Sequence, residues 1–144
     1  MIDWWKKVVF ENYANFSGRA RRSEYWYFTL FNIIIFVPLV ILFVVFAESG
    51  GNSEAISLIF MLFFIVVALA LLIPSIAVAV RRLHDTGKSG WWYILGVIPV
   101  VSYVGGIVLL VFYCMDGEPN SNKWGPNPKL AISNEIDEIG KEQF

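Results

Sequence analysis

Three long runs of uncharged, mostly apolar residues constrain how this chain can fold. They cover residues 26–47, 55–80 and 91–115, with lengths of 22, 26 and 25 residues. As helices, the first two would reach about 33 and 39 Å, enough to cross a hydrocarbon core about 30 Å thick. The runs are solidly apolar, whereas strands of a membrane barrel alternate in polarity and core helices of a soluble domain keep a polar face. The sequence therefore predicts an all-α, polytopic helical membrane protein.

The composition supports a membrane environment. Of the 144 residues, 57% are hydrophobic and only 16% are charged. A soluble domain of this size buries about two-thirds of the surface that its unfolded chain exposes. So many apolar residues would leave large apolar patches in contact with water, which soluble monomers rarely carry. The composition therefore argues against a soluble domain.

The third run, residues 91–115, contains helix-breaking positions. Gly96, Pro99 and the pair Gly105 and Gly106 interrupt it, and the part after the proline would reach only about 24 Å as a helix. We favour a single kinked crossing, because a non-helical turn at membrane depth must be shielded by protein and a short chain offers few partners. A re-entrant hairpin is the alternative. The prediction is thus about three transmembrane helices, the third broken by proline and glycine.

The segment before the first run has the pattern of a helix lying at the membrane interface. In MIDWWKKVVFENY, residues 1–13, the aromatic and aliphatic side chains fall near one helical face, with Lys6 and Lys7 beside it. We expect a single membrane-embedded domain over residues 1–129, followed by a polar, acidic tail over residues 130–144.

The distribution of lysine and arginine predicts the orientation. Residues 1–25 hold five of these cations, the loop 48–54 holds none, and the loop 81–90 holds three. Because basic residues flanking a span resist translocation, the N-terminus and the loop 81–90 should face the cytoplasm. The three lysines and six acids after residue 115 give little help in predicting the side on which the tail lies.

The polar segment RRLHDTGKSGWW, residues 81–92, contains two motifs that suggest chemistry. It resembles the end of a phosphate-binding loop, but Arg82 stands where that motif requires glycine. His84 and Asp85 could form an acid–base pair, yet neighbours on a helix point about 100° apart and rarely meet. One histidine and one cysteine, Cys114, cannot supply a zinc site. We therefore predict no catalytic residue, no metal and no cofactor.

Two arginine pairs, each followed by an aromatic pair, lie on the same predicted side of the membrane. Guanidinium groups bind phosphate bidentately, and each basic residue near an anionic surface contributes about 1 kcal/mol. These residues could form a polar cluster that binds anionic lipid headgroups or a partner protein, or they could act only as topology signals. The candidate ligand-binding residues are Arg19, Arg21, Arg22, Glu24, Arg81, Arg82, His84, Asp85 and Lys88.

Three functions follow from these features. The leading hypothesis is a non-enzymatic membrane protein whose partners are membrane lipids, further copies of itself or another membrane protein, with no nucleic acid. A channel or transporter component is the second, although the runs lack the ionisable residues that coupled transporters usually need. The third is an interfacial enzyme acting on lipid headgroups through His84 and Asp85, for which the sequence offers no nucleophile placed beside the histidine.

Three ordered motifs carry a resemblance to a known family. The chain contains FSGRARRSEYWYF, then RRLHDTGKSGWW, then NKWGPNPK. In this it resembles the bacterial family of small inner-membrane proteins of the YhaH and YhaI type, which is classed as a domain of unknown function. The resemblance covers about residues 4–129 and implies a bacterial inner membrane, a compact bundle of helices and no established activity. The chain departs from the family at Trp124, where tyrosine or phenylalanine is usual, and at Asn127, where aspartate is usual.

Overall fold

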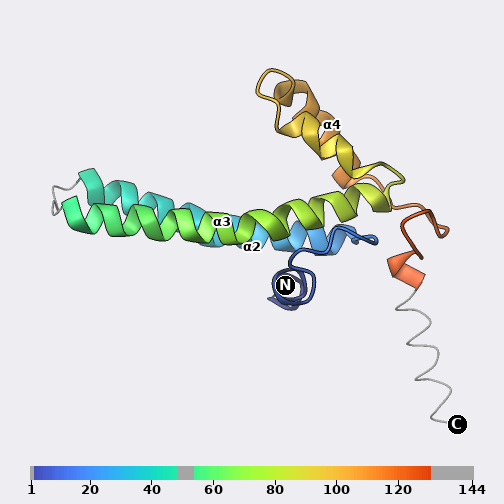
Figure 1. Cartoon of the computed structure of the whole chain (residues 1–144), viewed down its shortest axis with the longest axis horizontal. Helices are drawn as coiled ribbons and strands as arrows, with labels where there is room; N and C mark the ends of the chain where they lie inside the picture. The colour runs from blue at the N-terminus through green and yellow to red at the C-terminus, as the bar shows by residue number, and fades with distance from the viewer. Residues whose placement is uncertain (1, 49–53, 131–144) are drawn as a thin grey trace, which may run out of the picture.

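The chain is helical, with two long helices forming an antiparallel hairpin. The computed structural model describes residues 2–48 and 54–130, and its regular elements in these ranges are all helices. Helix α2 (Arg22–Glu48) and helix α3 (Glu54–Asp85) run side by side, and the other elements gather at one end of this pair (Figure 1). The first two apolar runs thus form long helices, as the sequence predicts.

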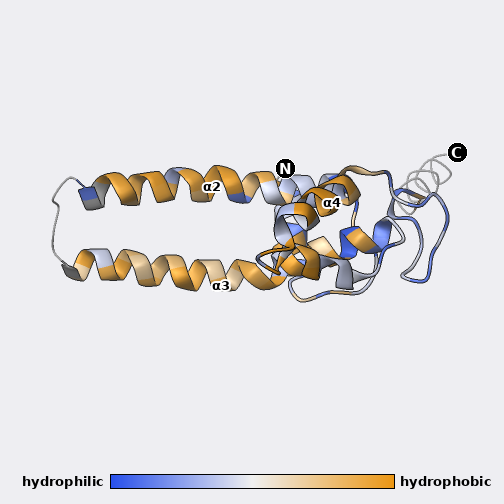
Figure 2. Cartoon of the chain, turned by 90° about the horizontal axis from the view of Figure 1, so that it is seen from above, coloured by the Kyte–Doolittle hydropathy of each residue, from blue (hydrophilic) through white to orange (hydrophobic). Residues whose placement is uncertain are grey.

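The long helices expose their apolar side chains. Their most apolar windows have a mean hydropathy of 2.9 and 3.2, and only 6% and 0% of the residues in these windows are buried. Figure 2 shows the hydrophobic colouring along both helices. Contacts between them include the ring of Phe43, whose centroid lies 6.2 Å from that of Phe60 and 6.3 Å from that of Phe64. Helices exposed in this way require an apolar solvent, and a lipid bilayer supplies it.

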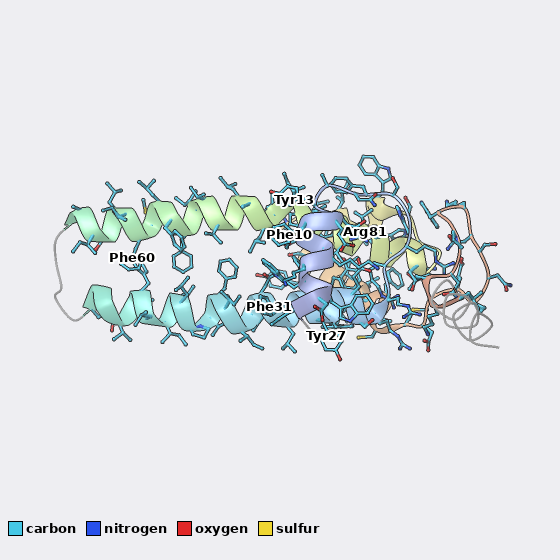
Figure 3. The ribbon with its side chains drawn as sticks, turned by 90° about the horizontal axis from the view of Figure 1, so that it is seen from below. Phe10, Tyr13, Tyr27, Phe31, Phe60 and Arg81 are labelled. Carbon is cyan, nitrogen blue, oxygen red and sulfur yellow. The ribbon has the colours of Figure 1, made fainter. Side chains whose placement is uncertain are left out.

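The N-terminal segment is helical, as predicted, and lies across the two long helices at their polar end (Figure 3). It consists of α1 (Ile2–Lys6) and the π-helical turn η1 (Lys7–Glu11). The Trp5 indole N–H donates to the Asn32 side-chain oxygen over 3.3 Å, which ties this segment to α2. The buried residues of the core beneath it are Val8, Ala20, Phe28 and Val78.

The third apolar run folds back on itself, which is the geometry of the alternative named above and not that of a straight or kinked rod, and a third membrane crossing is not confirmed. A 3-10 helix, η2 (Gly90–Gly96), is followed by a turn and by helix α4 (Ser102–Cys114), and the two helices pack together. Glycine makes this packing possible, because a Cβ at Gly105 would overlap the carbonyl oxygen of Leu95. The structure therefore contains two helices long enough to span a membrane and one shorter apolar helix, α4.

The segment after α4 returns to the C-terminal end of α3 and lies beside it. The backbone N–H of Glu118 donates to the carbonyl oxygen of Asp85 over 2.8 Å. A short turn closed by an isolated bridge between Asn122 and Gly125 follows. Apart from Leu130, the predicted tail 130–144 lies outside the described residues.

Candidate anion site at the base of the helical hairpin

Asp85, the last residue of α3, pairs with two arginines. Its Oδ1 accepts a hydrogen bond from Arg19 Nε over 2.9 Å, and its Oδ2 accepts one from Arg82 Nη1. The three side chains are 6%, 1% and 0% exposed, in the order aspartate, Arg19, Arg82. A buried carboxylate between two guanidinium groups is well compensated, and removing it would leave both arginines without a counter-charge.

Other N–H groups of these two arginines bind backbone carbonyls at the end of α4 and in the segment after it. Arg19 donates to the carbonyl oxygens of Asn120 and Glu118, over 2.7 and 2.5 Å. Arg82 donates to those of Tyr113, over 3.2 Å, and Met115. Their hydrogen-bonding capacity is therefore largely used within the protein.

Two other candidates, Arg22 and Lys88, face away from the site. Arg22 forms an exposed ion pair with Asp116 and donates to the Cys114 carbonyl oxygen over 3.1 Å. A hydrogen bond from Lys129 and the charge of Arg22 lower the pKa of Asp116 below its ordinary value. The ammonium of Lys88 lies over the ring of Phe112, 5.4 Å from its centroid. Lys88 thus contacts α4, and Arg22 contacts the end of α4 and Asp116 just after it.

His84 stacks on an aromatic ring and does not pair with Asp85. Its imidazole lies parallel to the Trp124 indole, with ring centroids 4.5 Å apart and planes 11° apart. Its Nδ1 lies 3.2 Å from the Gly18 carbonyl oxygen. The side-chain amide of Asn122 donates to the His84 carbonyl oxygen over 2.9 Å. This geometry positions the C-terminal segment and forms no acid–base pair with the neighbouring aspartate.

The first arginine of α3's basic pair, Arg81, differs from Arg82 because part of its guanidinium lacks a partner among the described residues. Its Nη1 donates to Glu24 Oε1 over 2.7 Å, and both side chains are 4% exposed. Its Nε and Nη2 are buried and have no hydrogen-bond partner within the described part of the chain, and neither does Nε of Arg21. These groups are donors that an anion could satisfy.

Arg81 and Arg21 line a cavity of about 440 Å3 under the N-terminal helix (Figure 3 labels Arg81 beside this helix). Four basic side chains and one acid, Glu24, stand in its wall. That volume is within the range of small-ligand sites, and the excess of positive charge selects anions. The lining residues are Trp4, Lys7, Asn12, Asn15, Ser17, Gly18, Arg19, Arg21, Glu24, Arg81 and Pro128.

The local chain path explains how the cavity forms. Gly18 adopts a φ of 82°, a left-handed conformation that turns the chain before α2. The backbone N–H of Ala20 then donates to the Arg81 carbonyl oxygen over 3.0 Å, which joins the start of α2 to the end of α3. The residues before Gly18 therefore close one side of the cavity.

The structure divides the nine sequence candidates into two groups. Arg19, Arg21, Glu24 and Arg81 line the cavity. Those that do not line it are Arg22, Arg82, His84, Asp85 and Lys88. Sequence reasoning missed the contribution of the N-terminal segment. Lys7 carried a signal, since it stands beside tryptophans in an interfacial pattern, but Asn12, Asn15 and Ser17 carried none.

The exposed apolar helices and the basic cluster at one end of them define the class of this molecule, a small helical integral membrane protein. Residues 13–126 match the family described as a protein of unknown function, DUF805, and the chain belongs to that family. This confirms the resemblance drawn from the three motifs.

Two curated relatives are named as inner membrane proteins. The chain is 40% identical to inner membrane protein YhaI of Escherichia coli K12 over 127 residues, which is 88% of this chain and 97% of the relative. It is also 40% identical to inner membrane protein YhaH of the same organism over 131 residues, 90% of this chain and 98% of the relative. No solved structure matches the chain.

Proposed function

We propose that this protein is a non-enzymatic inner-membrane protein that binds the phosphate of an anionic lipid headgroup in the cavity beside Arg81, on the cytoplasmic side. The observation that supports this most is the buried guanidinium of Arg81, which uses Nη1 for Glu24 and leaves Nε and Nη2 without partners. A buried donor without a partner costs about 1–3 kcal/mol. A ligand that supplies acceptor oxygens therefore recovers that free energy on binding.

Phosphate is the chemistry that fits these donors best. Its oxygens accept hydrogen bonds from guanidinium groups in a bidentate arrangement, and its negative charge offsets the excess of cations in the cavity wall. Lys7 and Arg21 add charge from two different elements, η1 and the segment before α2. A neutral ligand would leave those charges unbalanced.

The position of the cavity favours a lipid over a soluble phosphate. Trp4 stands in its wall, and the N-terminal helix above it lies across the apolar helices. Tyr13, just after that helix, donates from its hydroxyl to the Ala70 carbonyl oxygen over 2.7 Å. Tryptophan and tyrosine concentrate at headgroup depth in membrane proteins. A headgroup can thus reach the cavity from the surrounding leaflet.

The test is native mass spectrometry of the protein released gently from detergent. Wild type should retain an anionic lipid, and the double variant Lys7→Gln with Arg21→Gln should lose it. The matched control is Arg22→Gln, which removes one charge next to Arg21 but touches Asp116 outside the cavity. Equal lipid retention in wild type and the double variant would contradict the proposal.

A second variant examines the hydrogen-bond geometry. Arg81→Lys keeps a cation for Glu24 but removes the extra N–H donors, so lipid retention should fall while the protein stays folded.

A separate experiment distinguishes a lipid headgroup from free phosphate as the ligand. Lipid-free protein is titrated with inorganic phosphate and, separately, placed in nanodiscs of phosphatidylglycerol or phosphatidylcholine. Stabilisation by inorganic phosphate, with no preference between the two lipids, would identify a soluble phosphate ligand instead.

The alternatives are a channel or transporter component and an enzyme acting on headgroups. No contact among the described residues favours either of them. His84, the proposed acid or base of the enzyme, is stacked on Trp124 and lies outside the cavity lining. Solute flux in reconstituted vesicles and headgroup turnover are the assays that would support these alternatives.

A further inference from the structure

The apolar hairpin formed by η2 and α4 starts and ends beside the same end of α3. At its start, a Cβ added to Gly90 would lie 2.7 Å from Val80 Cγ1 and 3.4 Å from His84 Nε2, so the backbone packs directly on α3. At its end, the Glu118 N–H donates to the Asp85 carbonyl oxygen over 2.8 Å. Both ends are therefore attached to the last two turns of α3.

Two arginines fix the end of α4 at that position. Arg82 Nε donates to the Tyr113 carbonyl oxygen over 3.2 Å, and Arg22 Nη1 donates to the Cys114 carbonyl oxygen over 3.1 Å. A single crossing would place the end of the run about 30 Å from its start, on the other face of the bilayer. These bonds to the base of α2 and α3 exclude that arrangement.

The surface of the hairpin formed by η2 and α4 is apolar and outward-facing. Val100 at the turn is 84% exposed, Tyr103 is 83% exposed and Trp91 is 78% exposed. The run carries no charge, and Figure 2 shows the same hydrophobic colouring on α4 as on the two long helices. This surface needs an apolar solvent, as the long helices do. Helix α4 has 13 residues and reaches about 20 Å, which is less than the hydrocarbon core.

Hydrogen bonds within the turn between η2 and α4 pair part of its backbone, and each paired group lowers the cost of placing the turn within lipid. The Val97 N–H donates to the Ile94 carbonyl oxygen over 2.9 Å, and the Ser102 N–H donates to the Ile98 carbonyl oxygen over 2.7 Å. The Ser102 hydroxyl donates to the Pro99 carbonyl oxygen over 2.8 Å. These bonds reduce the number of backbone groups in the turn that would need shielding from lipid.

We infer that residues 90–115 form a re-entrant hairpin that enters the membrane from the side of the loop 81–90 and returns to that side, with lipid acyl chains covering its tip. The segment 116–130 then lies on the same face of the membrane as the N-terminal segment. This arrangement lets Arg19 bind the Asn120 carbonyl oxygen, and Arg82 the Met115 carbonyl oxygen just before the segment, without crossing the bilayer.

Single-cysteine labelling tests the inference. Cys114→Ser gives a cysteine-free background, and the Arg22 contact uses only the backbone of that position. Into it are placed, one at a time, Ser17→Cys, Ser121→Cys, Val100→Cys and Asn52→Cys, and sealed vesicles of both orientations are treated with a membrane-impermeant maleimide. Positions 17 and 121 should react from the same side, and position 52, between the two long helices in sequence, from the other. Reaction of 121 and 52 from one side would overturn the inference.

The cysteine at position 100 tests whether lipid acyl chains cover the tip of the hairpin formed by η2 and α4. The cysteine there should resist the impermeant reagent from both sides, and reaction from the side of position 17 would show that the tip lies in water. A nitroxide label at this position should be accessible to oxygen dissolved in lipid. Low accessibility to oxygen, together with disulfide-linked dimers of the Val100→Cys variant, would show that a second copy of the chain covers the tip and would also contradict the inference.

Discussion

Arg81 donates a hydrogen bond to Glu24 over 2.7 Å, and this buried ion pair joins the last turns of α3 to the first turn of α2. Removing two charges from water is costly, so such a pair is weak evidence of a gain in stability. It does hold the guanidinium of Arg81 in the cavity wall with two N–H groups unpaired. We therefore interpret the pair as positioning a ligand-binding group.

Glu24 is the single acid in the cavity wall, and neutralising it should strengthen anion binding. In Glu24→Gln the side-chain oxygen can still accept the Arg81 hydrogen bond, while the negative charge that opposes the ligand is gone. We expect affinity for phosphatidylglycerol in nanodiscs to rise about tenfold, or about 1.4 kcal/mol. The control is Glu118→Gln, an exposed acid outside the cavity lining. Weaker binding by Glu24→Gln would refute the placement of the ligand beside Arg81.

Asp85 should be essential for stability because it neutralises two buried arginines. Asp85→Asn leaves Arg19 and Arg82 without a counter-charge, and breaking a buried ion pair in this way costs about 3–5 kcal/mol. Unfolding in detergent, followed by circular dichroism, measures this loss. Asp116→Asn removes an exposed carboxylate nearby and should leave the melting temperature almost unchanged. Similar losses for the two variants would mean that burial of the triad is not what matters.

The paired glycines of α4 provide a matched test of the hairpin packing. Gly105→Ala should destabilise the fold by about 1–3 kcal/mol, since its Cβ would overlap the backbone of Leu95. A Cβ at Gly106 meets nothing within 4 Å, so Gly106→Ala should be neutral or stabilising by up to about 1 kcal/mol. Thermal unfolding of the two variants in one detergent makes the comparison. If Gly106→Ala proved the more harmful, the packing described for η2 and α4 would be wrong.

The stacking of Trp124 on His84 should hold the C-terminal segment against α3. Trp124→Ala removes the stacked ring, and an aromatic pair contributes about 0.5–1.5 kcal/mol. We expect trypsin to cleave after Lys123 about fivefold faster in this variant, a factor equivalent to about 1 kcal/mol. Trp124→Phe retains a ring and should be cleaved at close to the wild-type rate. Equal cleavage rates for all three proteins would show that the stack does not restrain the segment.

The sequence predicted the types of residue at the site better than their roles. It nominated both members of the pair Arg81 and Arg82, which are indistinguishable in the local pattern. Their roles differ because Arg82 meets Asp85 and the carbonyl groups of Tyr113 and Met115 at the end of α4, whereas the Arg81 side chain has Glu24 as its one hydrogen-bond partner among the described residues. Apart from Asp85, which lies three residues after Arg82, these partners lie 31 to 57 residues away along the chain, and no spacing rule connects them.

The sequence by itself determined the two long helices and the membrane environment, because uncharged apolar runs of sufficient length are stable in a bilayer as helices. It also determined the family, through the three ordered motifs. Only the tertiary structure decided the path of the third run and the composition of the cavity. The run has the same local preferences whether it crosses or turns back, and the contact of Gly105 with Leu95 selects the turn. Lys7 joins Arg21 and Arg81 only because the N-terminal helix folds over the ends of α2 and α3.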